Sequence, residues 1–92
     1  MNNKEAQQLL TNKLATYEHR GYDDLVSMVD QKSDRFEITG PSGVRYQVVI
    51  RVVWDDKPGQ AIRILGSIDD GGWRSFAPFD YGIMIEKPNS SA

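Results

Sequence analysis

A strict alternation of side-chain character from Val44 to Trp54 constrains the fold more than any other feature of this sequence of 92 residues. Every even position in the segment carries an apolar or aromatic side chain, whereas the odd positions include two arginines and a glutamine. Successive side chains of a strand point to opposite faces, so this period predicts a β-strand with one buried face and one wetter face.

A second strand is predicted over residues 61–68, after a polar turn over residues 55–60 that contains a Pro-Gly pair. One register keeps all the large apolar groups of this hairpin on the same face, and a slip of one residue would destroy it. That register pairs Trp54 with Ile62, Val52 with Ile64, Ile50 with Gly66, and Val48 with Ile68. Gly66 leaves a gap in the buried face, which we expect an aromatic ring from a helix to fill, Tyr17 or Tyr22.

Two helices are predicted before the first strand. Residues 4–20 carry apolar side chains at helical spacing, and Gly21 follows as a break. The spacing of i, i+4 and i+7 is made by Leu10, Leu14 and Tyr17. A shorter helix is predicted from Asp23 or Asp24 to about Lys32, with its acids at the N-terminal end.

Further strands are predicted over residues 35–39 and 81–86, and a Gly-Pro-Ser-Gly turn over 40–43 joins the first to the long strand. Short turns between consecutive strands favour an antiparallel meander. The sequence therefore predicts an α+β fold, in which two N-terminal helices pack on one face of a three- to four-stranded antiparallel meander sheet, a two-layer sandwich. We expect a single domain over residues 1–87 and a disordered C-terminal tail over 88–92.

Composition excludes several classes of protein. The absence of cysteine excludes a disulfide framework and a thiolate metal site. A formal net charge of −2 argues against nucleic-acid binding by the domain as a whole. The first 15 residues lack the apolar region of a signal peptide, and no apolar run could span a membrane. We expect a cytoplasmic protein without membrane contact and without a cofactor.

The outward face of the predicted hairpin carries three arginines interleaved with three aliphatic side chains. The arginines are Arg45, Arg51 and Arg63, and the aliphatic residues are Val49, Val53 and Leu65. Arginine mixed with apolar groups is typical of protein interfaces, so we expect a protein partner or self-association here. Contact of the same arginines with nucleic-acid phosphates is a second interpretation, although RNA-binding sheets expose aromatic rings and these strands point theirs inward. An ordinary solvated face is a third.

The loop over residues 69–75 adds a large aromatic side chain to this candidate surface. Trp73 and Arg74 follow two glycines, and such pairs anchor many interfaces. The alternative is that Trp73 folds back with Phe76 and Phe79 to close the edge of the core.

Two pairs of adjacent aspartates, Asp69-Asp70 and Asp55-Asp56, raise the question of a metal site. Calcium loops place oxygen ligands at alternate positions and end in a bidentate acid, and that spacing is absent from residues 69–72. In a meander the two pairs also lie at opposite ends of the sheet. Metal or small-ligand binding at this loop therefore ranks below an acid-rich turn.

Catalysis has little support in the sequence, and we expect no enzyme. His19 is the only histidine, and no motif places an activated serine or threonine beside it. Gly71-Gly72 lacks the lysine and the following helix of a phosphate-binding loop. The leading hypothesis is a small non-enzymatic protein-binding module, of a regulatory, immunity or adaptor type, that acts through the open sheet face and the 69–75 loop.

Overall fold

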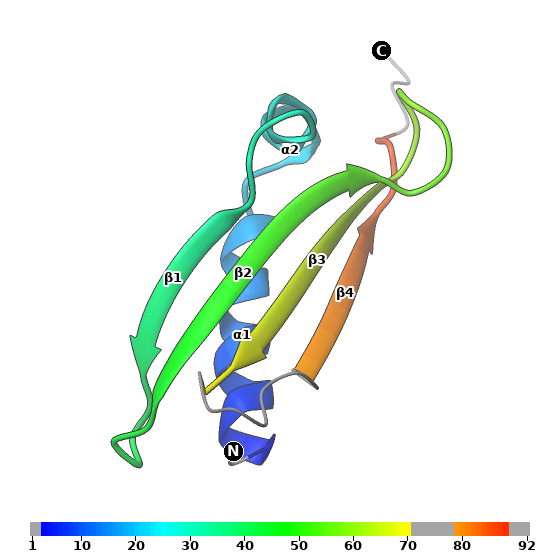
Figure 1. Cartoon of the computed structure of the whole chain (residues 1–92). Helices are drawn as coiled ribbons and strands as arrows, with labels where there is room; N and C mark the ends of the chain where they lie inside the picture. The colour runs from blue at the N-terminus through cyan, green and yellow to red at the C-terminus, as the bar shows by residue number, and fades with distance from the viewer. Residues whose placement is uncertain (1–2, 71–78, 89–92) are drawn as a thin grey trace.

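The computed structural model describes residues 3–70 and 79–88. In these ranges it has two helices and four strands, α1 (Asn3–Glu18), α2 (Tyr22–Met28), β1 (Asp34–Thr39), β2 (Arg45–Trp54), β3 (Ile62–Asp69) and β4 (Phe79–Ile85). The strands form one open antiparallel sheet in the order β1-β2-β3-β4, which is the simple meander that short turns favour (Figure 1).

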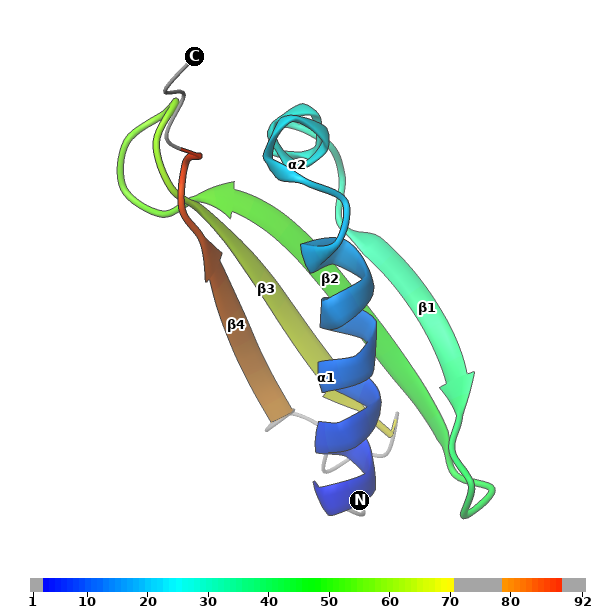
Figure 2. The same ribbon diagram turned by 180° about the vertical axis from the view of Figure 1, so that it is seen from behind.

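Both helices lie on the same side of the sheet, so the molecule has one helical layer and one sheet layer (Figure 2). α1 runs along the sheet and contacts β2, β3 and β4, whereas the short α2 contacts β2 and β3 near one end. This arrangement confirms the predicted α+β fold with four strands. The face of the sheet that points away from the helices has no second layer within the described residues (Figure 1).

The ends of two elements differ from the predicted ones. α2 ends at Met28 instead of near Lys32, because the following residues form a turn and the chain then enters β1 at Asp34. β4 begins at Phe79, two residues before the predicted start, directly after a proline. A proline cannot donate to the ladder but is tolerated at the start of an edge strand. The predicted tail lies outside the described residues from position 89 onward.

The register of the central hairpin is the predicted one. Trp54 pairs with Ile62, Val52 with Ile64, Ile50 with Gly66, and Val48 with Ile68. The inward residues of these strands pack with the apolar stripe of α1. The buried apolar residues are Ala6, Leu10, Leu14, Tyr17, Leu25, Tyr46, Val48, Ile50, Val52, Ile62, Ile64 and Ile68. Burial of this face fixes the register, because a slip by one residue would turn it to solvent.

The prediction that an aromatic ring fills the gap at Gly66 was wrong. A β-carbon placed at Gly66 would lie 2.8 Å from Leu10 Cδ1 and 3.1 Å from Leu14 Cδ2. Two leucines of α1 therefore occupy this space, and the missing side chain lets the helix approach β3 closely. Tyr17 lies one turn further along α1, where its hydroxyl has another role.

The hydroxyl of Tyr17 connects α1 to the start of β1. It donates a hydrogen bond to Asp34 Oδ2 at 2.5 Å, although the residue is only 2% exposed. Burial, and then the bond to the Asp34 carboxylate, raises the pKa of the Tyr17 hydroxyl above its usual range. The side chain thus contributes to the core with its ring and to the α1–β1 connection with its oxygen.

A second connection joins the N-terminal turn of α1 to the β1–β2 turn. The Glu5 carboxylate accepts hydrogen bonds from the Ser42 hydroxyl at 2.7 Å, the Ser42 N–H at 3.1 Å and the Tyr46 hydroxyl at 2.8 Å. Gly40 makes room for it, because a β-carbon there would lie 2.3 Å from Glu5 Oε1. The bond from the Ser42 hydroxyl is the main reason that the pKa of Glu5 is lowered. The charge of Glu5 therefore attaches the first turn of α1 to the β1–β2 turn.

Candidate functional site

The outward face of the sheet combines arginines with exposed apolar side chains, as the alternation predicts. Leu65 on β3 is 37% exposed and Met84 on β4 is 50% exposed, and these are the large exposed apolar residues of the described chain. Val49 and Val53 on β2 are half-buried beside them. Pairing places Arg63 between Val53 and Met84 in one row across three strands, whereas Leu65 lies two residues along β3 from Arg63 and is diagonal to both, so the apolar side chains form a strip that runs through Leu65.

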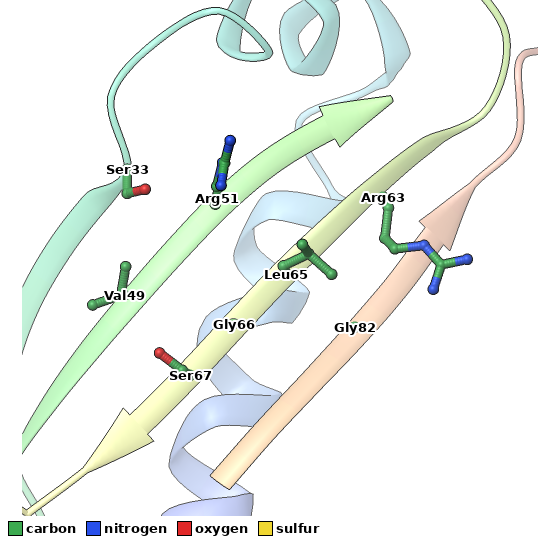
Figure 3. A pocket seen from close by; sticks show the side chains of 8 residues that line it. All are labelled: Ser33, Val49, Arg51, Arg63, Leu65, Gly66, Ser67 and Gly82. Carbon is green, nitrogen blue, oxygen red and sulfur yellow. The ribbon is translucent and has the colours of Figure 1, made fainter. Parts of the chain in front are cut away.

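A broad depression of about 630 Å³ lies at the centre of this face. Its described lining consists of Ser33, Val49, Arg51, Arg63, Leu65, Gly66, Ser67 and Gly82 (Figure 3). Arg51, Leu65 and Gly82 form one row of the sheet, with Leu65 in the middle. A β-carbon at Gly82 would lie 3.3 Å from Leu65 Cδ2, so the glycine leaves the floor of the depression low beside the leucine.

Two of the three predicted arginines are held by carboxylates of the same chain. Arg63 donates two hydrogen bonds to Asp55 Oδ1, from Nε at 2.8 Å and from Nη2 at 2.5 Å. Arg45 Nη2 lies 2.9 Å from Glu37 Oε1. Exposed pairs of this kind add little to stability, but they neutralise the charge that a partner would meet.

Arg51 differs from these two arginines. In both ion pairs the acid is offset by two residues from the position opposite the arginine, along the same diagonal of the sheet. On the β3 side, the neighbour of Arg51 along that diagonal is Ser67, which offers no negative charge. Arg51 makes no hydrogen bond or ion pair with any described residue. Its guanidinium is therefore an exposed charge that no described residue of the chain neutralises.

The structure brings only part of the predicted site together. Arg51, Arg63 and Leu65 meet in the depression, whereas Arg45 lies at the opposite end of β2 from Trp54 and does not line it. Trp73 and Arg74 lie outside the described residues. The sequence predicted outward residues on β2 and β3 only, so it missed residues of this face that come from other segments. These are Ser33, Gly82 and Met84, and the last two could have been found from the alternation over 81–86.

The two aspartate pairs lie at opposite ends of the hairpin, as predicted. Asp69 pairs with Gln47 near the start of β2, whereas the Asp55 N–H donates to Ala61 O in the β2–β3 turn. In residues 3–70 and 79–88, no three His, Asp or Glu side chains gather closely enough to hold a metal ion. His19, which follows α1, belongs to the helical layer and not to the sheet face.

No protein-family model, curated protein or solved structure matches this chain. Neither described helix is long and apolar enough to cross a membrane. The function is therefore inferred from the residues of the chain itself.

Proposed function

We propose that this chain is a non-enzymatic protein-binding module that uses the open face of its sheet. The observation that carries the proposal is the exposure of Leu65 at the centre of a depression, next to an arginine that has no partner in the described chain. Apolar contact area with an arginine at its centre is typical of the energetically important part of protein interfaces.

The distribution of apolar groups supports the same proposal. A solvated sheet face normally alternates apolar inward residues with polar outward ones. On this face Val49, Val53, Leu65 and Met84 instead form a strip across β2, β3 and β4. Such a strip loses water when a partner covers it, which is the main driving force of association.

The proposal is tested with Leu65→Asp. We expect the substitution to weaken binding of the natural partner, captured from native lysate and then purified, by at least tenfold, because it places a charge in an apolar contact. Thr11→Asp, on the exposed side of α1, is the matched control and leaves binding unchanged. Circular dichroism of both variants checks that the fold is retained. Full binding by Leu65→Asp would contradict the proposal.

Self-association is one form of this function, and sedimentation distinguishes it. If the partner is a second copy, the wild type sediments as a dimer and Leu65→Asp as a monomer. If the wild type already sediments as a monomer, the partner is a different protein.

Binding to nucleic-acid phosphates is the second candidate, and the charge of Arg51, which no described residue pairs, favours it. Ion pairing of Arg45 and Arg63 weighs against it, since a phosphate backbone is bound by several cations together. Salt separates the two candidates. Phosphate binding falls steeply between 50 and 200 mM salt, whereas a mixed apolar interface changes little.

A further inference from the structure

We propose that the depression around Arg51 binds an acidic side chain of a protein partner, with an aliphatic side chain of the same partner on Leu65. The inference rests on the proposed protein-binding function and adds the chemistry of the partner. It follows from the hydrogen-bonding groups of the depression, from the lack of a counter-ion for Arg51 among the described residues, and from the apolar neighbours of Arg51.

The polar groups that line the depression are suited to an anion. The guanidinium of Arg51 offers donors in a planar fork, which matches a carboxylate in a bidentate arrangement. Ser33 lies beside it, because the next residue, Asp34, pairs with Ile50 of β2 (Figure 3). Ser67 lies on the other side, and both hydroxyls can also donate. None of the described lining residues is an acid.

The placement of acids on this face leaves the position next to Arg51 open. Glu37 and Asp55 are each used by another arginine, and each lies on the same diagonal relative to its partner. Ser67 lies at the other end of this diagonal, on the β3 side of Arg51, and offers a hydroxyl and no carboxylate. A carboxylate supplied by a partner could pair with Arg51, as Glu37 pairs with Arg45 and Asp55 pairs with Arg63.

The apolar neighbours of Arg51 indicate that the ligand carries an apolar group as well as a negative charge. Leu65 lies directly opposite it on β3, and Val49 lies two residues away on the same face of β2. An ion pair strengthens when apolar contacts remove the surrounding water. The favoured ligand therefore carries Asp or Glu close to Leu, Ile or Val. A phosphate backbone would meet one free guanidinium among apolar groups, which is a poorer match.

The test is a selection of random peptides displayed on phage, carried out on the full chain. Leu65→Asp serves for counter-selection, so that only peptides bound through the face are kept. We expect the kept sequences to be enriched in Asp or Glu within a few residues of an aliphatic side chain. In the best peptide, replacing the acid by its amide should weaken binding to the wild type about tenfold or more, as for a charged hydrogen bond.

Arg51→Gln identifies the residue that recognises the acid. In this variant the acid and amide peptides should bind within about twofold of one another, because the charge that distinguishes them is gone. Arg45→Gln is the matched control, since it removes an arginine on the same strand that Glu37 already holds, and it should keep the tenfold preference.

The outcomes separate this inference from the proposed function. Neutral or basic peptides that bind through Leu65, or an acid preference that survives in Arg51→Gln, would overturn the acidic partner and leave the binding function standing. If no sequence is enriched against Leu65→Asp, both are rejected. Binding of a ten-nucleotide single strand of DNA that Arg51→Gln abolishes, without an acidic peptide, would favour phosphate and also reject the inference.

Discussion

Gly66 is the residue at which the helical layer and the sheet come closest. We predict that Gly66→Ala lowers the free energy of unfolding by about 1–3 kcal/mol, because the new methyl group would meet Leu10 Cδ1 at 2.8 Å in a packed core. Alanine normally suits a strand better than glycine, by about 0.5–1 kcal/mol, and the clash has to exceed that gain. Urea unfolding measures the difference.

Gly82→Ala is the matched control for Gly66→Ala. Its β-carbon would meet the exposed Leu65 at 3.3 Å on the uncovered face, where the side chain can move aside, so we expect a change within about 0.5 kcal/mol. Leu10→Ala combined with Gly66→Ala should cost less than the sum of the two. A Gly66→Ala protein as stable as the wild type would show that α1 can shift away from β3.

The hydrogen bonds of Glu5 to the β1–β2 turn predict that the stability of the protein depends on pH. Hydrogen bonds from Ser42, and then from Tyr46, favour the ionised carboxylate and lower the pKa of Glu5 below the ordinary 4.5. A lowered folded-state pKa stabilises the protein above the unfolded-state value, and the stabilisation is lost as the pH falls through the folded-state value. Glu5→Gln lacks this contribution at every pH.

The measurement is the melting temperature of the wild type and of Glu5→Gln between pH 7 and pH 2.5. We expect the wild type to be more stable at pH 7 and the gap to narrow below pH 4.5. Glu18→Gln, an exposed change on the same helix, is the control and should show no such narrowing. A constant gap down to pH 2.5 would mean that the carboxylate charge does not matter to the junction.

At the scale of elements, the bond between Tyr17 and Asp34 predicts how firmly α1 is attached to β1. Tyr17→Phe should lower the free energy of unfolding by about 1.5–3 kcal/mol, the range for a hydrogen bond to a charged group. Tyr22→Phe is the comparison, because its hydroxyl donates at 2.6 Å to the exposed carbonyl of Gln60 and should contribute about 0.5 kcal/mol. Equal losses in urea unfolding would contradict this ranking.

The elements themselves were largely predictable from the sequence. Alternation along β2 and β3 specified one face and thereby the register, and helical spacing specified α1. What fills the gap at Gly66 was not predictable, because it depends on where α1 crosses the sheet, and the pattern of one helix does not determine that. The leucines at 10 and 14 reach this point before Tyr17 does.

The sequence predicted the outward arginines of the candidate site, but not which of them are paired with acids. Three outward arginines could be read from the alternation, yet two of them meet acids that come from β1 and from the β2–β3 turn. Opposite charges on neighbouring strands pair across a sheet, so the predicted register already contained this information for Asp55 and Arg63. Arg51 stands out only after these pairings are known.

At the scale of the whole molecule, the two layers divide stability from binding. The helices cover one face of the sheet and complete the core there, whereas the candidate surface lies on the other face. Removing exposed side chains such as Arg51 therefore takes little from the core. A surface of this kind can change its partner without a change of fold.

The same arrangement predicts an order of local stability, which amide hydrogen exchange can measure. β2 and β3 are paired on both sides and carry most of the buried strand residues, so their amides should exchange only through global unfolding. α2 has seven residues with only Leu25 buried, and its amides should exchange through local opening at lower free energy. Amides of α1, buried at four positions, should follow β2 and β3. Exchange of α2 at the global free energy across a guanidinium series would show that this short helix unfolds only with the sheet.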